Sequence, residues 1–301
     1  MEKVKLGLCQ MKVVDNKQQN IKRAIAMITK ASENGANLAI LPEMFNCPYE
    51  NEKFVEYCEV RDSSFTLNSI SSIAKEKSIH VLAGSIPEKV IVKDNVDKVQ
   101  EYIYNTSFLF DNNGKILGFH RKMHLFDIDI EDKLCFNESD TLKAGNKVTV
   151  IDTKFGKIGI AICYDIRFME LSRLMTLKGA KILIFPGAFN LTTGPAHWKL
   201  LFQSRAIDNQ VFTVGVSSAL NKDSSYESYG HSIVCNPWGE AIAQGKYDEE
   251  LIIAEIDLNE LAKIRKELPT LSNRRSDVYE LKLKNNNNNN NNINNVLKKT
   301  F

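Results

Sequence analysis

The stretch KIGIAICYDIRFMEL (residues 157–171) combines a buried strand, a cysteine and the start of a helix. Its first six residues are mostly apolar, as in a strand inside a sheet, and apolar residues then recur at helical spacing. Gly179 ends that helix, because glycine readily adopts the backbone conformation that follows a helix C-terminus. Cys163 therefore falls in a sharp strand-to-helix turn, an arrangement that exposes a nucleophilic side chain.

Cys163 has the most specific chemical context of the six cysteines. The start of the following helix is expected to favour the thiolate, and the Tyr164 amide N–H is expected to stabilise an oxyanion. A nucleophilic thiol also needs a base. The chain has five histidines, none with a local spacing typical of that role: His80, His120, His124, His197 and His231. A carboxylate can replace histidine where its surroundings raise its pKa, and Glu43 is the candidate.

Working outward, the first part of the chain alternates strand and helix patterns. KVKLGLCQ (3–10) alternates like a strand, residues 16–34 have helical periodicity, and NLAILPEMF (37–45) is a short apolar strand. Paired strands without helices follow, as in the hairpin predicted at Asn113-Gly114. The mixture predicts a single α/β domain, most simply two sheets packed together with helices outside.

Composition excludes several classes of protein. The chain has 301 residues, with 39 Lys plus Arg against 37 Asp plus Glu, and basic residues cluster only in pairs, so no nucleic-acid footprint is expected. No apolar run approaches about 18 residues, and the start lacks a secretory signal pattern. The scattered cysteines contain no CxxC pair, which argues against a disulfide framework. These features predict a cytoplasmic protein that does not bind a membrane.

Two polar segments stand apart from the predicted domain. Residues 285–301 begin with eight asparagines and lack any apolar period, which predicts a disordered tail. Residues 93–101 carry alternating charge and are interpreted as an exposed loop. The catalytic or binding domain is accordingly expected over residues 1–284.

Glu43, Lys122 and Cys163 share one topological feature. Each follows an apolar strand and lies where loops gather at the carboxyl ends of strands, the usual place for sites in α/β sheets. Taken alone, a Pro-Glu pair carries little information, and a lysine at a strand end is usually a solvated charge.

Three ordered motif blocks make these residues more specific: LPEMF around Glu43, HRKMHLFD around Lys122 and GIAICYDIRFMEL around Cys163. The blocks resemble those of the nitrilase superfamily, the carbon–nitrogen hydrolases, and the resemblance covers residues 4–284. It implies a four-layer α-β-β-α sandwich, a Glu-Lys-Cys triad and a second acidic residue in the pocket, Glu138. It also implies a homodimer, with no metal or organic cofactor.

Further segments resemble the omega-amidase branch of this superfamily: PGAFNLTTGPAHWKLLFQSRAIDNQVF, GHSIVCNPWGE and NRRSDVY. That branch implies a small-molecule substrate, 2-oxoglutaramate or 2-oxosuccinamate, whose terminal amide is hydrolysed through a thioester on Cys163. The substrate carboxylate needs donors, and Arg167 can offer a bidentate fork. It can equally pair with Glu170 or Asp165.

Two aromatic residues complete the predicted pocket. Tyr49 is a second candidate donor to the substrate, and Phe189 either closes the pocket or packs in the core. Three alternatives to an omega-amidase remain open. The first is a sibling enzyme, namely a deaminated glutathione amidase, a nitrilase or a carbamoyl amidohydrolase. The second is a non-catalytic scaffold with the same fold, and the third is a papain-like hydrolase with a histidine base.

Overall fold

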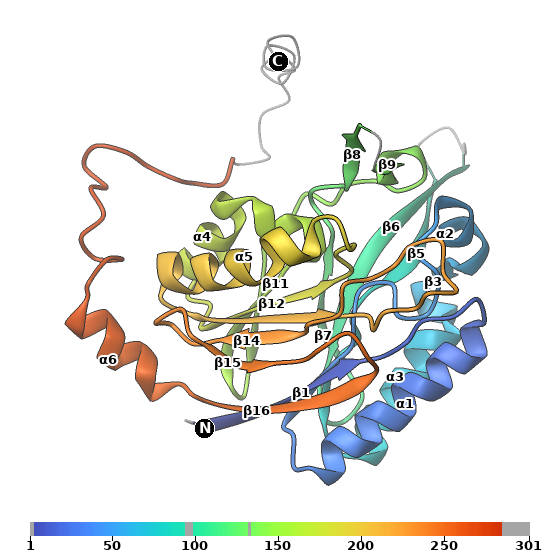
Figure 1. Cartoon of the computed structure of the whole chain (residues 1–301), viewed down its shortest axis with the longest axis horizontal. Coiled ribbons are helices and arrows are strands. Elements are labelled where there is room, and N and C mark those ends of the chain that lie inside the picture. Colours follow the sequence, from blue (N-terminus) through green and yellow to red (C-terminus); the bar gives the residue numbers. More distant parts are fainter. Residues whose placement is uncertain (1–2, 94–98, 132–133, 285–301) are drawn as a thin grey trace.

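A computed structural model describes residues 3–93, 99–131 and 134–284. Two large sheets lie face to face, with helices α1 and α3 covering one and helices α4 and α5 covering the other (Figure 1). The predicted four-layer α-β-β-α architecture is therefore confirmed. The predicted tail, 285–301, lies outside the described residues.

The first sheet combines parallel and antiparallel pairing, in the order β16-β1-β2-β4-β6-β5-β3 with β7 beside β6. Its early strands are parallel because helices α1 (Lys17–Glu33) and α3 (Phe65–Glu76) connect them by crossovers. The strands are β1 (Lys3–Gln10), β2 (Leu38–Ile40), β3 (Glu59–Val60), β4 (His80–Leu82), β5 (Ile86–Lys93), β6 (Val99–Phe110), β7 (Ile116–Arg121) and β16 (Glu250–Asp257).

The second sheet has the order β10-β11-β12-β13-β14-β15. Helices α4 (Met169–Leu177) and α5 (Gly194–Asn209) make the parallel crossovers, and α6 (Asn259–Glu267) follows β16. The strands are β10 (Thr149–Thr153), β11 (Gly156–Ile160), β12 (Ile182–Gly187), β13 (Phe212–Ser217), β14 (Ile233–Cys235) and β15 (Ala241–Gln244).

Three apolar layers stabilise the sandwich. The central layer packs β1 and β2 against β11, β12 and β13, and its side chains include Leu6, Leu8, Ile40, Ile160, Ile184 and Val214. One outer layer joins α1 and α3 to the first sheet, and the other joins α4 and α5 to the second. Because both faces of each sheet are covered, the central strands are continuously apolar in sequence.

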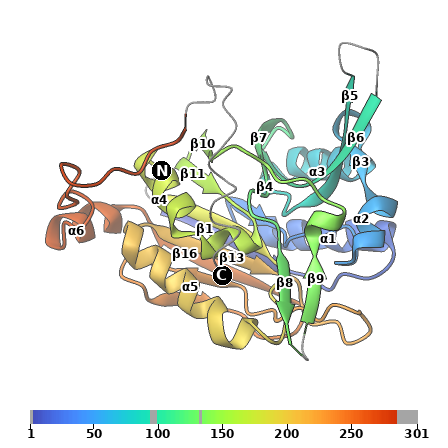
Figure 2. The same ribbon diagram turned by 90° about the horizontal axis from the view of Figure 1, so that it is seen from above.

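Smaller elements were not predicted from the sequence. Helix α2 (Asn51–Tyr57) and a separate hairpin, β8 (Asp127–Ile130) with β9 (Leu134–Asn137), lie beside the first sheet. Figure 2 shows this hairpin projecting from the body of the sandwich. The interpretation of 93–101 as a loop was wrong at both ends, because Lys93 pairs with Val99 in the β5–β6 hairpin, and residues 94–98 lie outside the described residues. Within the described ranges, no helix is long and apolar enough to cross a membrane.

Candidate active site

The fold gathers the three predicted residues from distant parts of the sequence. Glu43 follows β2, Lys122 follows β7 and Cys163 follows β11, so each lies just beyond the carboxyl end of a strand. The Lys122 amide still donates to the Asn105 carbonyl oxygen of β6, which fixes the start of the lysine segment. Glu138 begins the 3-10 turn after β9, where its amide donates to the carbonyl oxygen of Phe126 and closes the β8–β9 hairpin.

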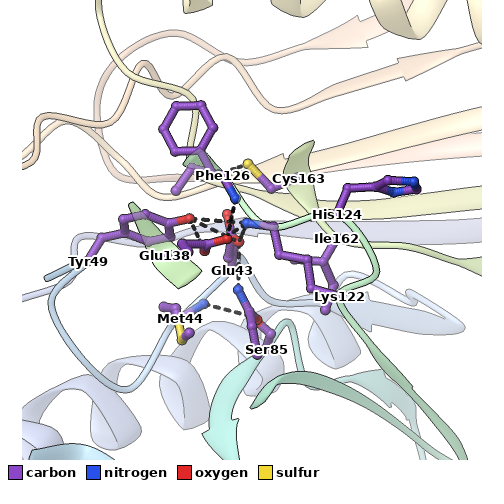
Figure 3. Close-up of polar contacts among 12 residues, drawn as sticks. Glu43, Met44, Tyr49, Ser85, Lys122, His124, Phe126, Glu138, Ile162 and Cys163 are labelled. Atoms are coloured by element: carbon purple, nitrogen blue, oxygen red, sulfur yellow. Dashed lines mark hydrogen bonds and ion pairs between the residues drawn. The ribbon is translucent and has the colours of Figure 1, made fainter. Parts of the chain in front are cut away.

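The Lys122 ammonium lies between two carboxylates in the centre of the site (Figure 3). Its Nζ is 2.9 Å from Glu43 Oε1, 2.8 Å from Glu138 Oε1 and 3.2 Å from the Tyr49 hydroxyl. An ammonium has three N–H donors, so these contacts use all of them. Although burial lowers the pKa of Lys122, the neighbouring carboxylates of Glu138 and Glu43 raise it well above its ordinary value. Lys122 is therefore charged at neutral pH.

Glu43 has one occupied and one free carboxylate oxygen. Oε1 accepts hydrogen bonds from Lys122 and, at 2.8 Å, from Asn105 Nδ2. Oε2 is buried and accepts none from the described residues. Burial raises the pKa of Glu43, Lys122 opposes that shift, and the charge of Glu138 adds to it. The side chain thus combines a raised proton affinity with an open acceptor, two properties of a general base.

Cys163 occupies a strained position in the predicted turn. Its φ of 45° lies in the left-handed region that side chains other than glycine rarely adopt. The Ala188 amide N–H, which follows β12, lies 3.5 Å from its sulfur. Burial, and then the charge of Glu43, raise the pKa of the thiol well above its ordinary value. The following turn was expected to favour the thiolate, but desolvation outweighs that effect and keeps the proton on the sulfur.

The structure places Tyr49 in the carboxylate cluster. Its hydroxyl donates a short hydrogen bond to Glu138 Oε1 and accepts one from Lys122. The side chain is buried, and its ring packs 4.6 Å from that of Tyr226. In this structure the single hydroxyl proton of Tyr49 is directed to Glu138, and the role of Tyr49 as a donor to the substrate carboxylate stays a prediction.

Arg167 has no carboxylate partner among the described residues, so neither predicted pairing, with Glu170 or with Asp165, is formed. Its Nη1 donates to His197 Nδ1 at 3.2 Å, and its buried Nε has no partner in that part of the chain. The guanidinium lies 4.8 Å above the ring of Phe189, which also packs edge-on against Trp198. Phe189 is thus a core residue that supports the arginine.

The histidines have other partners than the cysteine. His120 and His124 contact Asp165, His80 packs against Phe155, and none of the five forms a hydrogen bond with Cys163 within the described chain. This arrangement leaves the papain-like alternative without its base. No group of three or more His, Cys, Asp or Glu side chains in the described ranges could hold a metal ion.

Comparisons with known proteins agree with this geometry. The sequence pattern of the carbon–nitrogen hydrolase family matches residues 5–266. Omega-amidase NIT2 of Bos taurus is 44% identical over 284 residues, covering 94% of this chain and 99% of its own, and nitrilase homolog 2 of Dictyostelium discoideum is 46% identical over 93% and 83%. The crystal structure of Saccharomyces cerevisiae Nit3, a member of branch 10 of the nitrilase superfamily, matches with a TM-score of 0.80 at 40% identity, covering 91% of this chain and 97% of that one.

The fold and the carboxylate–lysine–cysteine site define an enzyme that hydrolyses carbon–nitrogen bonds. The chain belongs to the carbon–nitrogen hydrolase family of the nitrilase superfamily. The resemblance drawn from the three motif blocks is confirmed.

Proposed function

We propose that this enzyme is an omega-amidase that hydrolyses the terminal amide of 2-oxoglutaramate and 2-oxosuccinamate. The observation that carries the substrate class is Arg167, a guanidinium with a partly buried environment, a contact with His197 in place of a carboxylate, and an unused Nε. Such a group can bind the far carboxylate of a dicarboxylic monoamide. The similarity to omega-amidases over nearly the whole chain supports the same choice.

The first half of the reaction forms a thioester. Glu43 Oε2 takes the thiol proton as the Cys163 sulfur attacks the amide carbon, and the carbonyl oxygen becomes an oxyanion. The Tyr164 amide and Lys122 stabilise that charge. All three N–H donors of Lys122 are engaged at rest, so one of its hydrogen bonds must break before Lys122 can donate to the oxyanion. The bond to the Tyr49 hydroxyl is the longest, at 3.2 Å, and therefore the weakest of the three. The C–N bond then breaks, and the nitrogen leaves as ammonia with the proton held by Glu43.

The second half hydrolyses the thioester. Glu43, again unprotonated, removes a proton from water as the water oxygen attacks the acyl carbon. The C–S bond then breaks, and the leaving Cys163 thiolate takes that proton from Glu43. A cavity of about 20 Å³ adjoins Glu43, enough for roughly one water molecule. Its polar lining residues include Tyr49, Ser218, Asn221, Tyr226 and Ser228. Proton transfer is thus carried by one carboxylate in both halves.

Hydrolysis of five compounds tests the assignment. Ammonia release is measured with 2-oxoglutaramate, L-glutamine, an N-carbamoyl amino acid and a simple nitrile, and release of cysteinylglycine is measured with deaminated glutathione. An omega-amidase should act on 2-oxoglutaramate at least about tenfold faster than on L-glutamine, because the 2-oxo group replaces a charged ammonium. Comparable rates on both would refute the proposed substrate. Preference for deaminated glutathione, for the carbamoyl compound or for the nitrile would favour a sibling enzyme, and no hydrolysis of any of the five compounds would favour a scaffold.

The proposed clamp on the substrate carboxylate, Arg167, is tested by the substitution Arg167→Lys. We expect KM for 2-oxoglutaramate to rise about 10- to 100-fold, because lysine cannot form the bidentate pair, which contributes about 1.5–3 kcal/mol. The kcat should change little, since the Glu43, Lys122 and Cys163 side chains are untouched. Arg173→Lys, on α4, is the control and should keep the wild-type KM. An unchanged KM in Arg167→Lys would eliminate the clamp.

We further propose that the enzyme is a cytoplasmic homodimer. Large apolar side chains are exposed on the outer face of α4 and α5: Met169, Leu177, Leu200 and Ile207. Exposed apolar clusters on neighbouring helices are typical of protein interfaces. Light scattering should therefore give the mass of two 34.1 kDa chains, and the mass of one chain would contradict the proposal.

A further inference from the structure

Asp165 is a fully buried carboxylate that the proposed mechanism does not use. It lies two residues after Cys163, and each of its two carboxylate oxygens accepts two hydrogen bonds. Oδ1 accepts from the His124 amide at 2.9 Å and from His124 Nδ1 at 2.7 Å. Oδ2 accepts from the Ile162 amide at 3.0 Å and from His120 Nε2 at 3.1 Å. A buried carboxylate in such a network is satisfied and fixed in position.

These bonds join two motif blocks of the site. His120 and His124 flank Lys122 in one segment, whereas Ile162 directly precedes Cys163 in the other. The Asp165 amide also donates to the Ile162 carbonyl oxygen at 2.9 Å, which closes the turn around the cysteine. Cys163 holds its positive φ inside this turn. Such strain costs about 1–3 kcal/mol and persists only where the surroundings over-determine it.

The rings of both histidines also contact a second residue, which fixes their orientation. His120 Nδ1 is 3.0 Å from Thr149 Oγ1 on β10, and the His124 ring stacks on Phe168 with 3.7 Å between centroids. Burial raises the pKa of Asp165, but the hydrogen bonds from His120 and His124 outweigh that effect and lower it well below its ordinary value. The carboxylate is thus ionised whenever the enzyme works near neutral pH.

We propose that Asp165 is a positioning residue for carbon–nitrogen hydrolysis. Its carboxylate holds the Lys122 segment and the Cys163 turn in one fixed relation, so that the sulfur and the ammonium meet the same carbonyl group. The inference rests on the proposed nucleophilic role of Cys163 and not on the choice of amide substrate. A misplacement of about 1 Å between reacting groups can cost about 100-fold in rate, which sets the size of the expected effect.

Asp165→Asn tests this role. The amide keeps the shape of the side chain, but its NH2 group faces N–H donors at one of the two oxygen positions, so two accepting contacts are lost. We expect kcat to fall about 100-fold with KM within about threefold of wild type, since Arg167 is untouched. Alkylation of Cys163 by iodoacetamide, followed from pH 6 to 10, should show a changed rate and pH profile. A purely structural residue would alter neither in a folded variant.

Glu59→Gln is the matched control. Glu59 is a half-buried carboxylate on β3 that accepts from the Thr66 amide at 3.0 Å and pairs with Lys17 at 3.0 Å, away from the motif blocks. Both variants should lower the melting temperature, but only Asp165→Asn should lose kcat and change alkylation. Wild-type kcat and alkylation in folded Asp165→Asn, or equal losses in Glu59→Gln, would overturn the proposal.

His124→Gln covers the case in which Asp165→Asn does not fold. This change removes the side-chain bond to Oδ1 but keeps the backbone bond, and it should give a smaller loss of kcat with a changed alkylation profile. Wild-type values for both would refute the positioning role. Failure of the omega-amidase proposal is a separate result, because it is seen as missing ammonia release from 2-oxoglutaramate by the wild-type enzyme, whose thiol alkylation can still be measured.

Discussion

Replacing Cys163 by alanine is expected to lower kcat for amide hydrolysis by about 10⁵-fold or more, because no other group can form the acyl bond. The fold should survive the change. The thiol is buried and its pKa is raised, so the native site contains an uncharged side chain at this position, and alanine leaves no charge unpaired. The measurement is ammonia release, with circular dichroism to verify folding.

Cys235→Ala is the matched control for this variant. Cys235 is as deeply buried, on β14 in the second sheet, and its loss should leave kcat within about twofold of wild type. Mass spectrometry of the acid-quenched wild-type enzyme should find the substrate acyl group on the peptide that carries Cys163. Turnover by Cys163→Ala, or an acyl group on another peptide only, would remove the nucleophile assignment.

Local sequence patterns predicted most of the sandwich. The alternation in KVKLGLCQ gave β1 over the same eight residues, and the helical period over 16–34 gave α1 within one residue at each end. Helix α1 buries one consistent face, and β1 places Val4, Leu6 and Leu8 in the central layer at every second residue, so periodicity reports both elements well. Helix α2 has only seven residues and depends on packing of Phe54 and Tyr57, which a periodicity window cannot resolve.

The candidate site was predicted in part. The motif blocks located Glu43, Lys122 and Cys163, and the family resemblance added Glu138. The structure brings these four side chains into one buried cluster. Asn105 and the Ala188 amide were missed, because an amide on a long strand and a backbone N–H have no sequence signature. The partner of the Tyr49 hydroxyl likewise depends on how the β8–β9 hairpin presents Glu138, a tertiary effect.

The two carboxylates differ although both contact the same ammonium. Glu138 Oε1 accepts from Lys122 and Tyr49, and its Oε2 accepts from the Phe126 amide at 2.7 Å. Both of its oxygens are therefore engaged, whereas Glu43 Oε2 is free. Two carboxylates in one site can be separated into different roles by their surroundings. Glu43 is the one able to accept a proton, and Glu138 is the one that fixes Lys122 and adds negative charge.

This difference predicts a large loss in Glu43→Gln. The glutamine oxygen can keep the bonds from Lys122 and Asn105, and its NH2 group replaces an oxygen without a partner, so the fold should be retained. Without the base we expect kcat to fall by about 10³- to 10⁴-fold, near the upper end for general base catalysis. KM should change little, because the Arg167 clamp remains.

The pH dependence separates the two carboxylates. Glu43 must be unprotonated to act, so wild-type kcat/KM should fall as pH decreases through its raised pKa. The charge of Glu138 contributes to that raised pKa, and Glu138→Gln should therefore move the acid limb to lower pH. In Glu43→Gln, the small residual kcat/KM should no longer fall at low pH. Profiles of kcat/KM from pH 4 to 9 test this assignment. If the low-pH fall is unshifted in Glu138→Gln and is still the wild-type one in Glu43→Gln, the base is another group.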